Sequence, residues 1–221
     1  IEGATDAVDA PFMAVTLGKL HLWRGDLDEA AVWLDRASRF AEPFLDNQIV
    51  ARALPALASV HRRRAAPDAA RAHAARGAAL ARRLDLPHVV AESLDESALL
   101  AAGSDAARAE QLHHEALAIR VEHGLRTSWP DSLDALARLA ARAGRHAEAV
   151  RLLAASDPAR DAVGHPRPPV DEPDHAALVA SLREALGPEG FARAWAEGAS
   201  LAPDQAVAYV TRARGARGRP S

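Results

Sequence analysis

Turn signals recur along this chain at an almost constant spacing. Gly25, Ala65, Ser104 and Gly144 stand 40, 39 and 40 residues apart, and each lies between two stretches where Ala and Leu recur at helical spacing. A fixed period of this size is typical of proteins built from repeated helix pairs. One pair cannot bury its apolar stripe alone, so the spacing predicts pairs stacked on one another.

Matching positions in the repeats carry the same small and apolar residue types. The first helices contain Leu17–Gly18, Leu57–Ala58 and Leu136–Ala137. The second helices contain Ala30, Leu34 and Ala37; Ala70, Ala74 and Gly77; Ala109, Leu112 and Ala116; and Ala149, Leu153 and Ser156. This pattern resembles the tetratricopeptide unit, in which small residues mark the contact between two antiparallel helices. The period exceeds the roughly 34 residues of that unit and is similar to the superhelical repeats of maltose-regulator-like ATPases.

Composition favours the same fold. Apolar residues make up 49% of the 221 residues and aromatic residues only 4%, so the core must consist mainly of Ala, Leu and Val. Small side chains let helices approach closely, and no alternating run of Val, Ile, Thr or Tyr predicts a strand. We therefore expect an all-α protein, a right-handed α-solenoid of about four tetratricopeptide-like helix pairs with a small C-terminal helical cap.

The best internal boundary is a Pro-rich stretch. Residues 158–171 hold four Pro and one Gly, which predicts a linker and places the end of the preceding helix at Pro158. The expected domains are the repeats over 1–157, this linker over 158–171, a cap over 172–211 and a basic tail over 212–221. Within the cap, the pattern predicts short helices over 173–186, 188–198 and 203–213.

The closing segment carries a more specific pattern than the repeats. Phe191, Ala194, Trp195 and Gly198 precede an Arg-rich stretch that ends in Pro220. The segment resembles the end of the helical-repeat region in large LuxR-type ATPase transcriptional regulators, where such a linker leads into a helix-turn-helix domain. The resemblance implies a piece of a longer regulator. Of the 27 basic residues 26 are Arg, a bias that indicates a high-GC genome, as in many actinobacteria. Trp195 is expected to pack into the cap, and Ala202 stands where the family usually has a capping Ser or Thr, a role that Ser200 would have to take.

No pattern of reactive residues predicts an enzyme. The chain has no Cys and no phosphate-binding or nucleophile-elbow motif. His113 and His114 are neighbours on a helix and point about 100° apart, so they cannot readily share one metal ion. We expect both to be exposed on a polar face. No catalytic, cofactor-binding or metal-ligating residue is expected, and no cofactor in this chain.

The repeat register predicts a binding groove. In tetratricopeptide-like folds the first helix of each pair lines the concave surface, and Arg and aromatic side chains there suit an anionic or peptide partner. The same side chains could instead be ordinary solubilising groups whose stems lie over apolar helix surface. The expected partner-binding residues are Phe12, Lys19, Trp23, Arg52, Arg62, Arg63, Arg138 and Arg142, with Ser59 and Asp134 on the same surface.

Charge and hydropathy bear on partners and location. The net charge is −3, so the chain has no basic excess for nucleic acid, and the four Arg of the tail are too few for tight binding to DNA phosphates. We expect no direct sequence-specific DNA binding and read the tail as a disordered linker. No apolar run reaches the roughly 20 residues of a membrane span. With no Cys, the chain suits the cytoplasm.

The resemblance implies a sensor and coupling function. The region would bind a protein or small effector in its concave groove and bias the ATPase and DNA-binding domains of its parent chain. Two alternatives stay open: a free-standing tetratricopeptide scaffold that binds a peptide, or the sensor arm of a regulator whose DNA-binding or cyclase domain lies upstream. The sequence does not identify the effector, the target genes, the flanking domains or the oligomeric state.

Overall fold

The structure, a computed structural model, describes residues 2–41, 47–202 and 204–210, and for 2–10, 40 and 41 it describes the backbone alone. All regular structure in these residues is helical, with no strand, which confirms the all-α prediction. The elements, in chain order, are α1 (Glu2–Arg24), α2 (Leu27–Ala41), α3 (Asn47–Arg63), α4 (Pro67–Arg83), α5 (Pro87–Ala101), α6 (Ala106–Glu122), the 3-10 turn η2 (Arg126–Ser128), α7 (Trp129–Arg142), α8 (His146–Val163), the 3-10 turn η3 (Pro169–Asp171) and α9 (Glu172–Ala199). A further helical stretch covers 204–210.

The four repeat turns lie where the sequence predicts them. Gly25, Ala65 and Gly144 each separate two helices with a positive φ, of 94°, 56° and 73° respectively. Glycine enters this left-handed region without steric cost, whereas Ala65 must be held there by its surroundings. Ser104 lies in the turn between α5 and α6. The helix–turn–helix periodicity is confirmed, and the right-handed stacking of four pairs stays a prediction.

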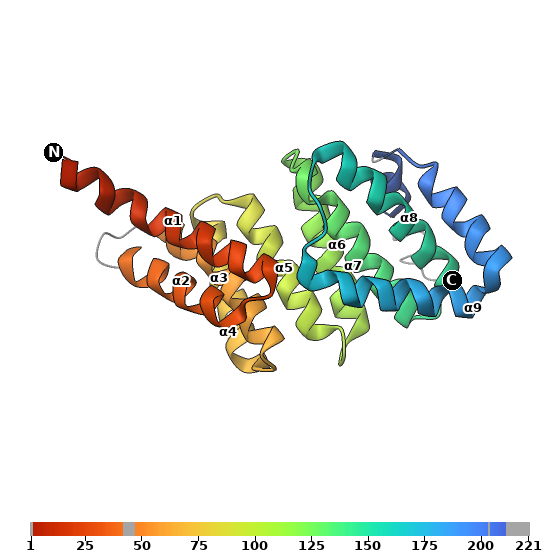
Figure 1. Ribbon diagram of the computed structural model, residues 1–221, viewed down its shortest axis with the longest axis horizontal. Coiled ribbons are helices and arrows are strands. Elements are labelled where there is room, and N and C mark those ends of the chain that lie inside the picture. Colours follow the sequence, from red (N-terminus) through yellow and green to blue (C-terminus); the bar gives the residue numbers. More distant parts are fainter. Residues whose placement is uncertain (1, 42–46, 203, 211–221) are drawn as a thin grey trace. The chain divides into compact units, whose positions relative to one another are not determined.

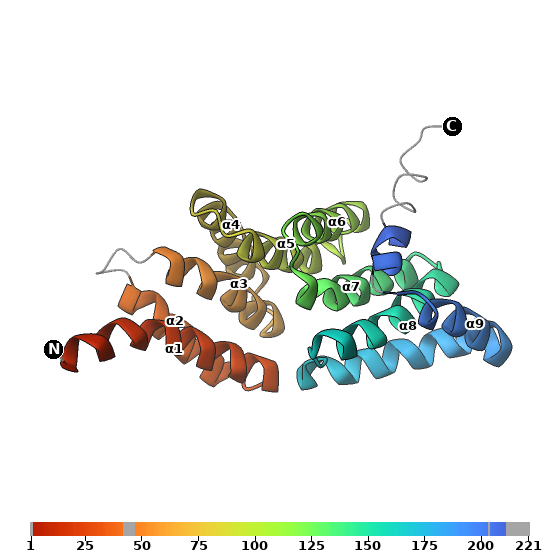
Figure 2. The ribbon, with the colours of Figure 1, turned by 90° about the horizontal axis from the view of Figure 1, so that it is seen from above.

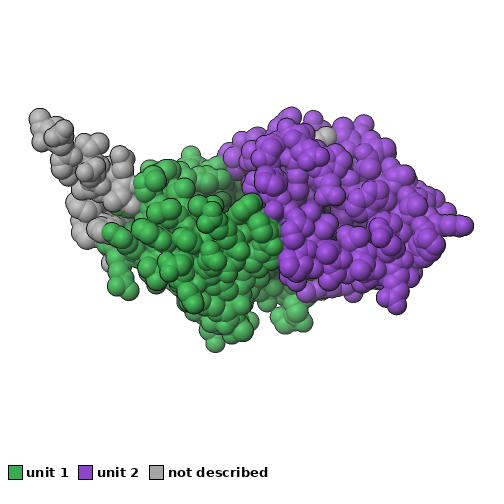
Figure 3. Space-filling model, viewed as in Figure 1, with its two compact units in different colours: residues 1–119, 168–170 green, residues 120–167, 171–221 purple. Residues whose placement is uncertain are grey.

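Two compact units make up the chain (Figure 3). Unit 1 contains 1–119 and 168–170, and unit 2 contains 120–167 and 171–221. The division falls within α6, whose end belongs to unit 2, and the short segment Pro168–Val170 groups with unit 1 although its neighbours on both sides group with unit 2.

In unit 1, sequence neighbours pack against each other and first helices also meet. Figure 1 shows α1 beside α2, and α2 packs on α3, α3 on α4 and α4 on α5. In addition, α3 contacts both α1 and α5, so the first helices of the first three pairs form one continuous set. Small residues permit these contacts. A Cβ built on Gly77 would lie 2.8 Å from Ser93 Oγ and 3.2 Å from Leu54 Cβ.

Unit 2 packs α8 between two neighbours. One side of α8 lies on α7 and another on α9, which runs beside it in Figure 2. Leu133, Leu152, Leu153 and Leu182 are almost fully buried between these helices. α9 is interrupted at Gly187, which has a φ of 67° and a ψ of 170°, and the change of helix direction is visible in Figure 1.

One predicted boundary is wrong. Pro158 lies inside α8 and does not end it, so the first six residues of the predicted linker, 158–163, are helical. Proline in a helix interior removes a hydrogen bond and costs about 3 kcal/mol. Ala154, Ala155 and Ala159, which flank Pro158, are buried, and Arg160 beyond it makes buried ion pairs, so packing outweighs that cost. The division into a repeat domain over 1–157 and a cap over 172–211 stays a prediction. The predicted tail, 212–221, lies outside the described residues.

The predicted cap helices agree with the structure over the residues it describes. The break at Gly187 separates 173–186 from 188–198, as expected, and 204–210 falls within the third predicted helix. Trp195 is half-buried, with its ring stacked on Phe191 at 5.5 Å between centroids. Ser200 does not take over the capping role, because its Oγ donates to the Glu197 carbonyl at 2.8 Å. Gln205 does so, because its Oε1 accepts the Ala202 N–H at 2.9 Å.

Other helix starts follow ordinary capping chemistry. Asp105 Oδ1 accepts the Arg108 N–H at 2.9 Å and so caps the start of α6. Pro67 and Pro130 both lie in the first turn of a helix, where proline is favoured because its missing N–H would have no partner there. The Asp26 carboxylate, just before α2, lies 3.4 Å from Nδ1 of the His21 ring. No helix in the described part of the chain is long and apolar enough to cross a membrane.

Candidate interaction surface

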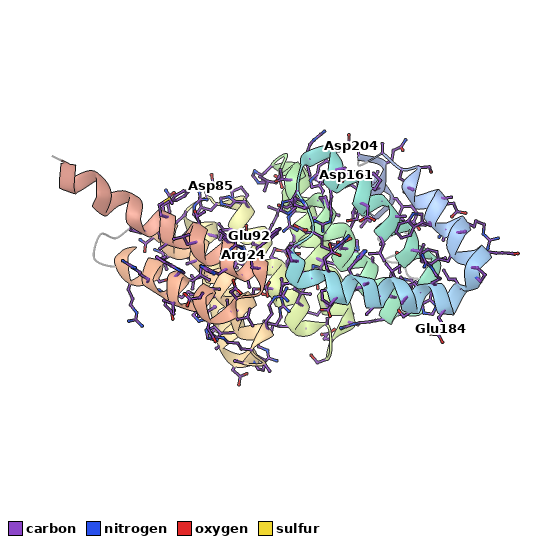
Figure 4. All side chains as sticks on the ribbon, viewed as in Figure 1. Arg24, Asp85, Glu92, Asp161, Glu184 and Asp204 are labelled. Atoms are coloured by element: carbon purple, nitrogen blue, oxygen red, sulfur yellow. The ribbon has the colours of Figure 1, made fainter. Side chains whose placement is uncertain are left out.

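Charged side chains from three first helices meet in unit 1. Lys19 of α1 donates from Nζ to Glu92 Oε2 of α5 at 2.9 Å. Arg62 of α3 donates from Nε to Glu96 Oε2 of α5 at 2.8 Å and also reaches Ser59 Oγ at 3.3 Å. Glu92 is labelled among the side chains of unit 1 in Figure 4. The helices α1, α3 and α5 therefore share one polar surface.

A histidine and a further arginine extend this surface. Burial lowers the pKa of His88 below its usual 6.5, and the positive charges of Arg52 and Lys19 lower it further, while Glu92 acts in the opposite direction. These couplings place Arg52 and His88 beside the Lys19–Glu92 pair, with the His88 ring neutral at pH 7. The charged face is defined here as Lys19, Arg52, Arg62, His88, Glu92 and Glu96.

The predicted groove residues of unit 1 lie on α1 and α3, as the register required. Lys19, Arg52 and Arg62 belong to the charged face. Phe12 keeps about half of its side chain exposed, and Trp23, Arg63 and Arg52 are half-buried. Ser59 is buried under Arg62 and does not offer a free surface. Whether these residues bind a partner stays a prediction.

The sequence reasoning missed the acidic half of this surface. Glu92 and Glu96, four residues apart on α5, lie on one helix face. The first helix of the third repeat has no Leu–Ala or Leu–Gly pair at the matching position, so the repeat pattern does not assign its residues to the groove. Two acids at this spacing, opposite the Arg-rich helix α3, were the signal available. Their presence changes the chemistry, because two of the predicted free cations are already neutralised.

In unit 2 the predicted groove position Asp134 is buried. Its side chain is about 2% exposed, and its Oδ2 accepts from Arg160 Nη2 at 2.8 Å and from Arg167 at 3.1 and 3.2 Å. The assignment of Asp134 to an open groove is therefore wrong. Arg138 and Arg142, the other predicted residues of α7, are half-buried and exposed, respectively.

Asp134 belongs to a larger ionic network. Arg160 Nη2 also contacts Asp131 Oδ1 at 2.8 Å, and Arg167 Nη2 contacts Asp157 Oδ1 at 3.0 Å. We call Asp131, Asp134, Asp157 and Glu172 the carboxylate cluster. It draws on α7, α8 and the start of α9, so these ion pairs connect the three helices.

The network shifts the pKa of several members. Burial acts to raise the pKa of Asp131, but the hydrogen bond with His165 and the charge of Arg160 outweigh it, and the net pKa is below the usual value. The same hydrogen bond raises the pKa of His165 against the effect of burial. Burial would lower the pKa of Arg160, yet Asp134 and Asp131 raise it overall. His175 has a lowered pKa because of burial and the nearby Arg167.

The expectation of exposed histidines on α6 is wrong. His113 is only 2% exposed, with Nδ1 2.8 Å from Asp95 Oδ1 of α5, and His114 is buried as well. The position of His113, four residues after Ala109 and three before Ala116, puts it on the buried face of the helix. Among the described side chains, no group of three or more His, Asp or Glu is placed to hold a metal ion.

Comparison with known proteins gives partial relatives. No protein-family model matches the chain. A protein of Mycobacterium bovis and two of Mycobacterium tuberculosis, all provisionally named HTH-type transcriptional regulators, are each 44% identical to it over 108 residues. The match covers 49% of this chain and 12% of each relative, so the similarity spans about one eighth of the length of these regulators.

Proposed function

We propose that this chain is a non-catalytic interaction region of an HTH-type transcriptional regulator. Its helix pairs would form a tetratricopeptide-like solenoid that binds a protein or small effector and couples this binding to ATPase and DNA-binding domains outside these residues. The 44% identity to regulators over about half of the chain supports the regulatory role. The repeat pattern and the closing segment from Phe191 support the assignment to the LuxR-type ATPase group.

The observation that carries the binding role is the convergence of α1, α3 and α5 on the charged face. A surface assembled from three helix pairs changes when the pairs move relative to one another. A partner that binds one arrangement better than another therefore shifts the equilibrium between them, and such differential binding is what coupling requires. The Lys19–Glu92 and Arg62–Glu96 pairs supply both signs of charge, which suits a partner with acidic and basic groups.

Charge reversal at one ion pair tests the binding role. Arg62→Glu places a second carboxylate opposite Glu96, whereas Arg62→Glu combined with Glu96→Arg restores an ion pair of opposite polarity. Introduced into the complete regulator, both variants should abolish the transcriptional response to its signal. The double variant should keep the melting temperature of the wild type, which separates lost recognition from lost folding.

Three results would contradict the proposal or favour an alternative. An unchanged transcriptional response in the double variant would show that Arg62 takes no part in recognition. A coding sequence with no helix-turn-helix domain on either side would favour the free-standing scaffold. Such a domain upstream instead of downstream would favour the related sensor arm.

A further inference from the structure

Arg167 is held in unit 2 as a bound ligand would be. Its side chain is 9% exposed although it lies outside the helices, on the short segment between α8 and η3. Its guanidinium meets carboxylates from three helices: Asp134 of α7, Asp157 of α8 and Glu172 of α9, the last at 3.9 Å. The other arginine of the network, Arg160, lies within α8 and pairs with carboxylates of α7 alone.

The carboxylate cluster needs a cation at this position. Asp131, Asp134, Asp157 and Glu172 bring four negative charges, and Arg160 and Arg167 bring two positive ones. Without Arg167 the four carboxylates keep Arg160 and, below its raised pKa, His165. Asp134 is buried and keeps Arg160, whereas Asp157 and Glu172 are 43% and 54% exposed, so the loss of Arg167 leaves an excess of negative charge that favours another cation at this position.

One carboxylate oxygen of Asp134 accepts no hydrogen bond from Arg167. Arg167 donates from Nε and from Nη2 to the same oxygen of Asp134, Oδ2. This oxygen also accepts from Arg160. Asp134 Oδ1 is fully buried, and no donor among the described residues reaches it. A guanidinium that approaches a carboxylate with two parallel N–H groups bonds both oxygens and forms a stronger pair. The internal arginine is therefore a suboptimal occupant.

The segment that carries Arg167 is suited to leave. Residues 165–168 belong to no helix, and Pro166 and Pro168 have no N–H to donate to a neighbour. His165 and Arg167 attach the segment through their side chains, to Asp131 and to the acids described above. The His165 backbone also bonds to Arg160: its N–H donates to the Arg160 carbonyl at 3.1 Å, and its carbonyl accepts from Arg160 Nη1 at 3.4 Å. Another cation that takes the place of Arg167 therefore has to replace these polar contacts.

We propose that Asp134, Asp157 and Glu172 form a binding site for an arginine side chain of a protein partner, which Arg167 occupies as the chain's own ligand. The partner's guanidinium enters when the 165–168 segment moves out, and it bonds both oxygens of Asp134. The site is separate from the charged face of unit 1, and the inference does not rest on the proposed regulatory role.

Chemical rescue of the full chain tests whether the site accepts a guanidinium. Arg167→Ala should lower the melting temperature, and millimolar methylguanidinium should restore part of the loss. The same concentration of methylammonium should restore less, because a point charge cannot bond both oxygens of Asp134. Arg193→Ala, at an exposed position on α9, is the matched control and should show no rescue. Rescue of both variants to the same extent, or of neither, would overturn the site.

A peptide tests whether Arg167 competes with a ligand in trans. A labelled peptide with the sequence of residues 165–171, HPRPPVD, should bind the Arg167→Ala variant at least about tenfold more tightly than the wild type, measured by fluorescence anisotropy. Adding Asp134→Asn should remove this binding. Equal affinity for wild type and variant would mean that Arg167 does not block the site. If Arg167→Ala does not fold, Arg167→Lys keeps the charge and allows the same two comparisons.

Discussion

A glycine at a helix crossing is difficult to replace, because any larger residue adds a Cβ between the two helices. Gly198 of α9 packs directly on the backbone of α8: an added Cβ would lie 2.2 Å from the Arg151 carbonyl oxygen and 2.7 Å from its Cα. Backbone atoms cannot turn aside as a side chain can, so the two helices would have to separate. Gly198 belongs to the closing sequence pattern, and this contact gives a structural reason for a glycine there.

Gly198→Ala should therefore destabilise unit 2. Overpacking of this kind typically costs about 1–3 kcal/mol, and a backbone clash belongs at the upper end. Urea denaturation measures the free energy of unfolding. Gly103→Ala is the control, because a Cβ there meets nothing within 4 Å and should change stability by no more than about 0.5 kcal/mol. Equal effects of the two substitutions would show that α8 and α9 are not closely packed.

His165 gives a second residue-scale prediction, on pH. Its folded-state pKa is raised by Asp131, so the stability it contributes is present below pH 6.5 and is lost as the pH rises through that raised pKa. Asp131, whose own pKa is lowered, stays ionised throughout this range. His165→Asn should thus lower the melting temperature more at pH 5.5 than at pH 8.5. A difference that is independent of pH would exclude the His165–Asp131 interaction.

At the scale of elements, helices and turns could be predicted from the sequence, and side-chain environments much less so. The period of small residues located the turns at Gly25 and Gly144 because it records where helices touch. Pro158 was misjudged because helix propensity is local, whereas the burial that keeps α8 intact is not. His113 was misjudged from its residue type, although its position in the helix period indicated the core. The ion pairs of Glu92 with Lys19 and of Asp134 with Arg160 join residues far apart in sequence, and no local pattern specifies such pairs.

The helix over 204–210 depends on a cap that was not foreseen. Gln205 is three residues after Ala202 and supplies one half of a capping box, in which the side chain returns to the first N–H. Gln205→Ala should raise the rate of amide exchange within this helix, by the equivalent of roughly 0.5–2 kcal/mol. Hydrogen exchange measured by mass spectrometry resolves the segment. Exchange at α4 is the internal reference and should stay the same, and unchanged exchange in both regions would contradict the capping role.

At the scale of the whole molecule, histidines with shifted pKa values make the free energy of unfolding depend on pH between pH 7 and pH 5. Burial lowers the pKa of His73, His88 and His175, so between about pH 6.5 and each lowered pKa the unfolded chain binds more protons at these rings than the folded chain does. His165 acts in the opposite direction. The three rings with a lowered pKa lose folding free energy on acidification, and we expect their combined effect to exceed that of His165.

The melting temperature should accordingly decrease between pH 7 and pH 5, as measured by circular dichroism. His88→Asn should reduce that decrease, because a neutral amide replaces a ring that must be protonated next to Arg52. A melting temperature that rises on acidification would mean that the raised pKa of His165 dominates the linkage, and the effect of His88 would then need another explanation.

The Lys19–Glu92 ion pair connects the first and third helix pairs of unit 1. It joins α1 to α5 and so spans two helix pairs, while the neighbouring contacts each span one. A small tilt between adjacent pairs adds up over that span and changes the distance from Lys19 to Glu92 more than any contact between neighbours. The distance between Lys19 and Glu92 therefore varies with the curvature of unit 1. Both side chains are more than a third exposed, so the pair contributes at most about 1 kcal/mol, and the helix packing of unit 1 does not depend on it.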